Sequence, residues 1–576
     1  MPAYINGQQV DVPSVVLSIN DAAYASGASD PVVGLLLIGP ANDGVPNTVQ
    51  TFTDPTQAIA ALNSGDLLQG VLNAFAASTT APVVNQLDVI QVSPLTQATS
   101  SIPGVSSGPA FDLTTTHYGA PANTSQWQLN AGTLLGYQFQ QQLLATQAGG
   151  GTYASVTQDN LGLNALNVWY TGTGTDPTYT VTDSAFTVAA TTSDTGGTVD
   201  LTSSLTLTQL AQQISALAGW NATVTAPNAQ QTTAAFFDNQ ASVAVSTSST
   251  APTVVTAHGF ALAAYFAANP VYFTGTRPAN CGLLTTSSVW TVASGAASPA
   301  ATNTNWQNAY TTAQSAVGIG VVTPISSSVA IWDMNDAHCH YMRTLGIGRI
   351  GYVGDAVGAT LATEQANAAT LNSDRTGLVW PGLTGTDANG NATTFGAYVS
   401  SAPQLASMRA ASAATQALTG ATVRATGLEQ PCNVATAGQA NASGVIAIYS
   451  DQTTGGAPTI SWDRTTWQAS GPAPKVEMAM LVEQDILVQA FQAIAAPFIG
   501  PSANAAGVGA LQADLYAEAL SQYQAGIIVV EPQLSDFALS ASNGVISGTI
   551  RIQIGQPTNY VALTITLQNG VLSAAA

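Results

Sequence analysis

Three glycines, Gly346, Gly348 and Gly351, have the spacing of the G-x-G-x-x-G fingerprint of dinucleotide-binding enzymes. That motif holds a pyrophosphate only where a strand leads into the glycines and a helix follows, because the helix N-terminus then faces the anion. Here the order is reversed, since a helix-like segment ending in CHYMRTL precedes the glycines and the strand-like RIGYVGD follows them. We therefore expect Gly346 to end a helix, the other two glycines to allow close packing, and no cofactor to bind.

A nucleophilic site is equally poorly supported. The stretch GVSSG at residues 104–108 fits the G-x-S-x-G nucleophile elbow, but it has no buried strand before it and no helix after it, as that elbow requires. We expect a linker between domains there. His117 and His258 stand alone in the sequence, and no Ser or Cys can be grouped with a His and an Asp by spacing. The sequence therefore predicts no catalytic residues.

The segment DMNDAHCHY holds the best metal-ligand candidates, which are Asp333, Asp336, His338, Cys339 and His340. On a helix the two histidines point about 200° apart, and only the residues at positions 336 and 340 share a face. Two ligands do not hold a metal ion, which needs three or four. We expect no metal site.

Composition excludes further classes of function. Of 576 residues 46% are apolar, but only 7% are charged, against about a quarter in ordinary soluble proteins. Nine basic and thirty acidic residues give a net charge of −21, and no basic residue precedes Arg277. Nucleic-acid binding needs clustered cations, so we exclude it. A surface poor in long charged side chains loses little entropy when it is covered, which suits a subunit with many neighbours.

The compartment also follows from sequence features. Cys281, Cys339 and Cys432 form no C-x-x-C pair, so we expect neither a disulfide framework nor a zinc site. The first residues, MPAYINGQQVDVPSVV, lack the basic and apolar regions of a signal peptide, and no apolar run reaches the 18 or so residues of a membrane span. We expect a chain that folds in a cytoplasm and has no membrane partner.

The elements that would position any site suggest a multi-domain α/β (α+β) protein, since 576 residues are enough for roughly three or four domains. Residues 1–20 read as an N-terminal arm with one alternating strand, whose apolar residues are Val15, Leu17 and Ile19. Residues 21–100 and 300–397 read as two halves of one α/β domain, in which alternating strands and helices predict a largely parallel sheet. The first half includes a helix capped by Asp54 before Pro55.

Residues 101–299 interrupt that domain with a β-rich insertion. It contains short alternating segments such as YQFQQQL and LNVWYTG, and one helix with apolar residues at Leu207, Leu210, Ile214 and Leu217 that ends before Gly219. We expect one or two small β domains here.

Residues 398–542 form a second α/β region with two long helices and a strand at IIVVEP, and residues 543–576 form a terminal strand pair. Apolar and polar residues alternate strictly in the two terminal strands. Together with the N-terminal strand, they are our candidates for pairing between subunits. The candidate residues are Val15, Leu17, Ile19, Ile546, Ile550, Ile552, Ile554, Val561, Leu563, Ile565 and Leu567. The alternative is a hairpin that closes the sheet of its own domain.

Four segments in this order resemble the tail sheath proteins of contractile-tailed bacteriophages and of related contractile injection systems. They are GLLLIGPANDGVPNTVQTFTDPTQAIAALNSGDLLQGVLNAF, YVSSAPQLASMRAASAATQALTGATVRATGLEQP, GVIAIYSDQTTGGAPTISWDRTTWQ with its Arg464-Thr465 pair, and the C-terminal run that includes FIGPSAN and LYAEALSQYQAGII. The resemblance covers residues 30–92 and 320 to the end. The turn GPANDGVPN and the shortage of basic residues in the third segment depart from the family pattern.

The resemblance implies a mechanical protein of the virion tail, assembled in the cytoplasm of the host bacterium. Such a subunit polymerises helically around a tail tube, meets baseplate and tail terminator proteins, needs no cofactor, and links to its neighbours through terminal strands. Two alternatives remain at this stage. One is an acidic surface-layer or adhesin-like protein, and the other is an enzyme built on the α/β region.

Overall fold

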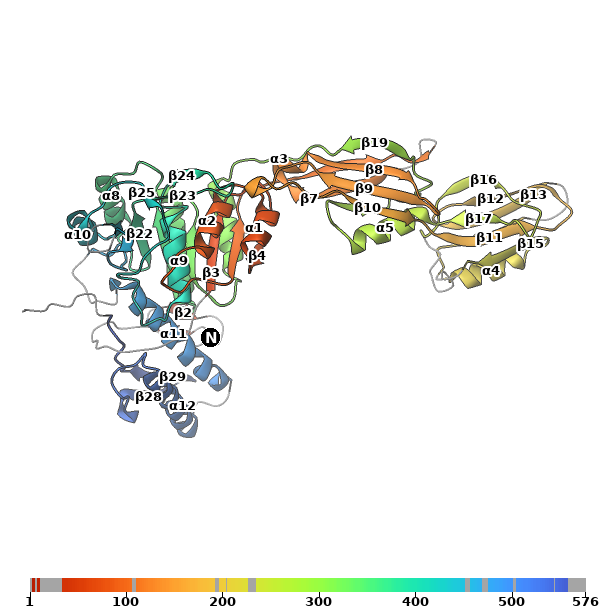
Figure 1. Cartoon of the computed structure of the whole chain (residues 1–576). Helices are drawn as coiled ribbons and strands as arrows, with labels where there is room; N and C mark the ends of the chain where they lie inside the picture. Colours follow the sequence, from red (N-terminus) through yellow and green to blue (C-terminus); the bar gives the residue numbers. More distant parts are fainter. Residues whose placement is uncertain are drawn as a thin grey trace, which may run out of the picture.

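The structure is a computed structural model, and it describes residues 3–5, 8–10, 34–105, 110–191, 196–203, 205–225, 235–450, 456–468, 475–500, 504–542 and 544–557. Figure 1 shows a compact α/β body, a long β-rich insertion that projects from one side of it, and a small C-terminal unit at the end of α11 (Met478–Ala495). The predicted multi-domain α/β architecture with a β-rich insertion is confirmed.

An eight-stranded sheet forms the centre of the body. Its strand order is β27-β26-β22-β21-β20-β3-β5-β4. The strands from β26 to β5 are parallel to their neighbours, and the two edge strands are antiparallel. The bounds are β3 (Gly34–Gly39), β4 (Val49–Phe52), β5 (Leu87–Gln91), β20 (Ile319–Pro324), β21 (Ile350–Gly354), β22 (Thr376–Trp380), β26 (Val445–Tyr449) and β27 (Thr459–Ile460). The largely parallel sheet predicted from the alternation of elements is therefore confirmed.

Helices cover both faces of this sheet, as a parallel sheet requires. Strand β3 shows why, because Leu35 and Leu37 enter one buried cluster while Leu36 and Ile38 enter another on the opposite face. Each such leucine contributes about 1.5–3 kcal/mol by burial. One face holds α1 (Pro55–Leu62), α2 (Asp66–Phe75) and α9 (Ser401–Ala411), and the other holds α6 (Asn303–Ala313), α7 (Val329–Thr344), α8 (Leu361–Leu371) and α10 (Val434–Ala442).

The sheet takes strands from both sides of residue 398, where the sequence suggested a boundary. Residues of β22 pair with residues of β26, so α9, α10 and β26 extend the same layered body. Helix α11 then leaves it. Its first turn, with Met478 and Leu481, packs into the cluster that β3 and α2 share, while Leu487 and Phe491 pack against the C-terminal unit.

The insertion contains two units in line (Figure 1). The inner unit packs α5 (His258–Ala268) on two sheets, of order β18-β7-β6 and β10-β9-β8-β19. Its strands are β6 (Gln97–Ile102), β7 (Phe111–Tyr118), β8 (Ser125–Ala131), β9 (Tyr137–Leu143), β10 (Val156–Leu161), β18 (Phe273–Thr276) and β19 (Ser287–Val292).

The outer unit packs α4 (Leu207–Ser215) with sheets of order β15-β11-β17 and β14-β13-β12-β16. Its strands are β11 (Asn164–Tyr170), β12 (Thr175–Val181), β13 (Ala185–Thr191), β14 (Gly197–Asp200), β15 (Trp220–Val224), β16 (Gln240–Ala244) and β17 (Thr253–Thr256). Helix α4 is the one predicted from its apolar stripe.

The expectation of a single helix in the insertion was wrong, because α5 is also present. Its sequence HGFALAAYFAA is apolar on every side, so it shows no stripe. Its N-terminal cap also comes from a distance, since the carboxylate of Asp238 accepts hydrogen bonds from the backbone N–H groups of His258 at 2.7 Å and Gly259 at 2.8 Å. The sequence directly before this helix therefore contains no capping residue that would indicate its start.

The C-terminal unit packs α11 and α12 (Ala505–Gln524) against a hairpin of β28 (Phe537–Ser542) and β29 (Val545–Ile550). Both long helices were predicted. The strand expected at IIVVEP is wrong, because Ile528 makes only an isolated bridge to Ile554. Ile527 and Ile528 are apolar because they are buried in this unit, and they do not belong to a sheet. Within the described parts of the chain, no helix is long and apolar enough to cross a membrane.

Candidate functional site

The glycines at positions 346, 348 and 351 serve packing, as predicted. Gly346 follows the end of α7 with a positive φ of 74°. A Cβ atom on Gly348 would lie 1.8 Å from the carboxylate carbon of Asp485 in α11, and one on Gly351 would lie 2.2 Å from the amide nitrogen of Asn335. The strand β21 begins at Ile350. Helix leads to strand, the reverse of a phosphate-binding turn.

The metal candidates on α7 point in different directions. Asp333 is exposed, while His338 is buried and accepts a hydrogen bond from Arg349 over 2.9 Å between Nη1 and Nε2. Burial, and then the nearby Arg349 charge, lower the pKa of His338 to about 4, so this imidazole is neutral. His340 Nε2 lies 3.5 Å from Asp336 Oδ2. In the part of the chain that the structure describes, no three His, Cys, Asp or Glu side chains converge as metal ligands.

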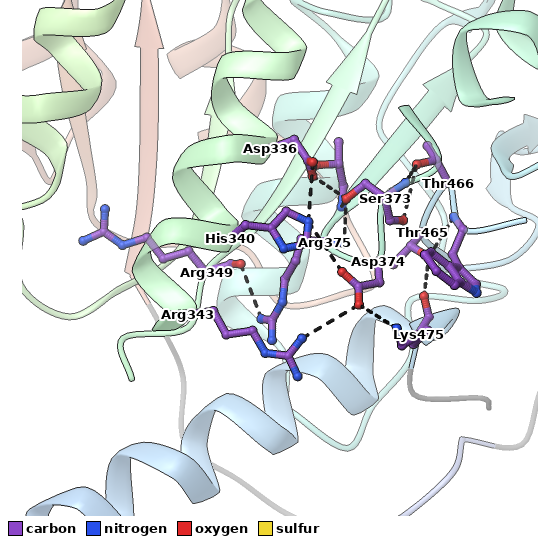
Figure 2. A network of polar contacts seen from close by, with 12 residues as sticks. Asp336, His340, Arg343, Arg349, Ser373, Asp374, Arg375, Thr465, Thr466 and Lys475 are labelled. Atoms are coloured by element: carbon purple, nitrogen blue, oxygen red, sulfur yellow. Dashed lines mark hydrogen bonds and ion pairs between the residues drawn. The ribbon is translucent and has the colours of Figure 1, made fainter. Parts of the chain in front are cut away.

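The candidates on α7 belong instead to a polar network at the N-terminal ends of β21 and β22 (Figure 2). Its centre is Asp374, which is mostly buried. The carboxylate of Asp374 lies 3.5 Å from His340 Nε2, 3.8 Å from Arg343 Nη1 and 3.6 Å from Lys475 Nζ. Lys475 also lies over the ring of Trp467, 4.5 Å from its centroid. One carboxylate thus holds cationic groups from two elements that are far apart in sequence.

A second pair fixes the C-terminal unit to the body. Arg375 stands directly before β22, is fully buried, and donates two hydrogen bonds to the carboxylate of Asp485 on α11, one of them 2.9 Å long. This two-bond geometry is the strongest that an arginine and a carboxylate make. Arg349, before β21, donates in the same region to the carbonyls of Ala313 and Ala316 at the end of α6. The N-terminal edge of the sheet is therefore where α6, α7 and α11 are joined.

The segment with the Arg464-Thr465 pair closes this network. Arg464 is buried and donates from Nη2 to the carbonyl of Trp467 over 2.7 Å. Thr465 donates from Oγ1 to the carbonyl of Lys475 over 2.6 Å. These bonds hold the chain on both sides of residues 469–474, which lie outside the described residues, and they position Lys475 beside Asp374.

A third polar contact joins the body to the insertion. Asp43, in the turn after β3, accepts the backbone N–H of Tyr118 at 2.6 Å, and its other oxygen lies 2.5 Å from His117 Nδ1. A Cβ atom on Gly119, which has a φ of 71°, would lie 2.6 Å from the carbonyl of Asn42. The two parts therefore meet through close backbone contact and a buried contact between the Asp43 and His117 side chains, which are 2% and 14% exposed.

The predicted strand candidates divide into two groups. Val15, Leu17, Ile19, Val561, Leu563, Ile565 and Leu567 lie outside the described residues. Ile546 and Ile550 lie on β29, which pairs with β28, and together with Ile552 they pack against the buried cluster of α11 and α12. Ile554 is buried in the same cluster. The long strand expected from residue 544 to 554 is regular only as far as Ile550.

The hairpin of β28 and β29 is a two-stranded sheet, and no third strand joins it among the described residues. Such a sheet offers unpaired backbone groups at both edges, which another strand can join. Pairing of these strands between subunits stays a prediction.

Sequence reasoning missed the contacts of Asp43, Arg375 and Asp485. Each is a charged residue next to, or within, an apolar element of a chain with few charges, and that position is the only signal the sequence carries. Their partners lie 74 and 110 residues away. No spacing rule connects residues so far apart.

Two solved structures have this fold along almost the whole chain. One is a sheath tail protein from Listeria innocua, with a TM-score of 0.55, 12% identity and coverage of 92% of this chain and 94% of the other. The other is a sheath tail protein from Desulfitobacterium hafniense, with a TM-score of 0.52, 12% identity and coverage of 90% and 93%. This chain has the sheath tail protein fold. No protein-family model and no curated protein matches the sequence.

The sheath tail fold agrees with the resemblance that the four sequence segments indicated. It includes the insertion, since the shared fold extends over 92% of this chain. At 12% identity most surface residues differ, so this likeness shows the fold alone. The chemistry of the surface has to be inferred from the residues of this chain.

Proposed function

We propose that this chain is the structural and mechanical subunit of a contractile tail sheath, which polymerises helically around a tail tube and drives it through an envelope. The observation that carries the proposal is the likeness to sheath tail proteins along nearly the full length of both chains. We assign the chain no catalytic step, because the glycine and histidine motifs that suggested one have structural roles.

The sequence predicted parts at residues 1–20, at 21–100 with 300–397, at 101–299, at 398–542 and at 543–576. Because β26 and β27 belong to the sheet of the body and β28 pairs with β29, we propose that the body continues through β27 and that the C-terminal unit begins at α11 and includes the hairpin. We keep the N-terminal arm and the insertion as predicted. The Arg375–Asp485 pair and α11 make the body and the C-terminal unit move together. The insertion projects from the body (Figure 1), and we propose that it faces away from the tube.

Strand pairing would join the subunits. The hairpin of β28 and β29 has open edges among the described residues, and the alternating Val15–Ile19 segment is suited to extend such a sheet in a neighbour. Backbone hydrogen bonds at flexible arms hold subunits together without fixing the angle between their bodies. Rigid bodies can then slide as the sheath contracts. The driving free energy would be the better-buried contacts of the contracted lattice, with no nucleotide hydrolysis.

The partners follow from this role. They are other copies of the chain, the tail tube protein, and the baseplate and terminator proteins at the two ends, all within the virion tail. The shortage of clustered cations argues against direct contact with nucleic acid.

Electron microscopy of the purified chain tests the proposal. Hollow tubes or stacked rings support a sheath, whereas flat two-dimensional arrays indicate a surface layer and overturn it. A chain lacking residues 1–20 should stay folded and soluble but form no tubes, and a chain lacking residues 1–7 is the control, because it keeps Val15, Leu17 and Ile19. If the chain without residues 1–20 still forms ordered tubes, the arm is not the link between subunits.

A further inference from the structure

The few basic side chains of this chain are unevenly distributed over its surface. All nine lie in described segments, and five of them are nearly or fully buried: Arg277, Arg349, Arg375, Arg409 and Arg464. Of the four that reach solvent, Arg424 and Arg551 are exposed at separate places. The other two, Arg343 and Lys475, meet at Asp374 together with His340. This is the one place on an acidic protein where cations gather at the surface.

Apolar side chains adjoin these cations. Tyr341 on the last turn of α7 is 47% exposed, Leu345 at its C-cap is 49% exposed, and Ile347 is 41% exposed. We call His340, Tyr341, Arg343, Leu345, Ile347 and Lys475 the α7 edge surface. The exposed fractions of its polar side chains are 44% for His340, 27% for Arg343 and 32% for Lys475. Exposed apolar groups beside ordered charges are typical of a protein contact.

We propose that the α7 edge surface is a contact between subunits, and that it receives an acidic surface of a second copy of this chain. The inference rests on the proposed sheath function, and it adds the residues of one interface. Each copy carries a net charge of −21, so copies repel one another unless cations at the contact offset the repulsion. Almost any other surface of a second copy is acidic or neutral, which makes it complementary to this one.

The geometry of Asp374 favours such a contact. Its one carboxylate faces Arg343, Lys475 and His340, and Asp336 near His340 already accepts from Ser373 and Thr376. The two fixed cations, Arg343 and Lys475, thus balance the carboxylates of Asp374 and Asp336 on a chain with a net charge of −21, and Asp374 keeps their side chains ordered (Figure 2). Ordered side chains lose less entropy on binding. Because the cationic surface and its acidic partner are different surfaces, the contact is head-to-tail and propagates into rings or helices.

A charge reversal at the surface tests this inference. We expect Arg343→Glu to raise the protein concentration needed for tube formation by about tenfold or more, which corresponds to about 1.4 kcal/mol per contact. Arg424→Glu makes the same change of charge at an exposed arginine elsewhere, so it is the matched control and should assemble like the natural chain. Arg343→Gln is the milder variant if the reversal disturbs folding, and circular dichroism of each monomer checks that it is folded.

A photo-cross-linking amino acid at position 341 identifies the partner. In assembled tubes it should cross-link to an acidic segment of a second copy, found by mass spectrometry. Cross-links to a tube protein instead, or tubes that form equally well from Arg343→Glu and from Arg424→Glu, overturn the proposed contact and leave the sheath function standing. A natural chain that forms no tubes or rings, even with a tail tube protein present, overturns both.

Discussion

The Nδ1 atom of His117 lies 2.5 Å from an Oδ atom of Asp43, and this contact joins the insertion to the body. The other Asp43 oxygen accepts the backbone N–H of Tyr118, and the His117 ring packs edge-on against Tyr153 and is stacked with Tyr272. The strands of the insertion begin at Gln97 and end at Val292, and Ser298 Oγ accepts a hydrogen bond from the backbone N–H of Ala120 over 2.7 Å, so the contact lies at the base of the insertion. A rigid joint here would carry the motion of the body outward.

We predict that Asp43→Ala loosens this joint. The change leaves His117 and the Tyr118 N–H without their partner, and each lost buried hydrogen bond costs about 1–3 kcal/mol. Spin labels on cysteines placed at the exposed positions 369 on α8 and 213 on α4 should report a broader distance distribution, because the native cysteines are buried and stay unlabelled. Asp88→Ala removes an exposed contact with Thr51 and is the control. An unchanged distribution in Asp43→Ala would show that backbone contacts alone hold the joint.

We predict that Glu364 on α8 makes the free energy of unfolding fall as the pH rises from about 4.5 to about 8. It is fully buried, and burial, followed by the charges of Asp355 and Glu429, raises its pKa to about 8. The unfolded chain ionises Glu364 near pH 4.5, whereas the folded chain keeps it protonated up to about pH 8. The free energy of unfolding therefore falls as the pH rises through this window, and the fall is complete above pH 8.

Glu364→Gln should remove this dependence. Urea unfolding at pH 6 and pH 9 should show that the variant gains stability relative to the natural chain as the pH rises, by a few kcal/mol at most, since one pKa unit is worth about 1.4 kcal/mol. Glu531→Gln, at an exposed position, is the control. Equal slopes in the two variants would mean that Glu364 is ionised in the folded protein.

Local sequence patterns were sufficient to predict the strands and helices of the body, but not the side-chain contacts that join the parts of the chain. The buried strands β3, β20, β21 and β22 are continuous apolar runs between turn residues, and helices α1 and α4 have local caps, so local patterns were enough to find them. Helix α5 was missed because its capping residue lies far away in the sequence. The strand predicted at IIVVEP was wrong because an apolar run in a helical unit has the same pattern as a buried strand. The pairs Asp43–His117 and Arg375–Asp485 depend on folding, which no local pattern encodes.

We predict that His338 gives the free energy of unfolding a pH dependence opposite to that caused by Glu364. Burial and the Arg349 charge lower its pKa from 6.5 to about 4, so the unfolded chain binds a proton between these values while the folded chain does not. The free energy of unfolding of the natural chain should fall as the pH drops from 6.5 to 4, by about 3 kcal/mol at most. His338→Gln has no proton to take up and should lose this part of the slope. Denaturation of both chains at pH 7 and pH 4.5 measures it. A slope unchanged by His338→Gln would contradict the prediction.

We predict that loss of the Arg375–Asp485 pair destabilises the C-terminal unit while the body stays folded. Asp485→Ala leaves a buried guanidinium without its carboxylate, which costs about 3–5 kcal/mol, and it opens space beside Gly348. We expect hydrogen exchange in α11 and α12 to accelerate, while β20 to β22 stay protected, because the body has its own core. The double variant Arg375→Met/Asp485→Ala removes both charges and should recover much of the lost stability. If the double variant is as unstable as Asp485→Ala, packing against Gly348 and not the ion pair holds α11 in place, and the body and the C-terminal unit are joined by contact area alone.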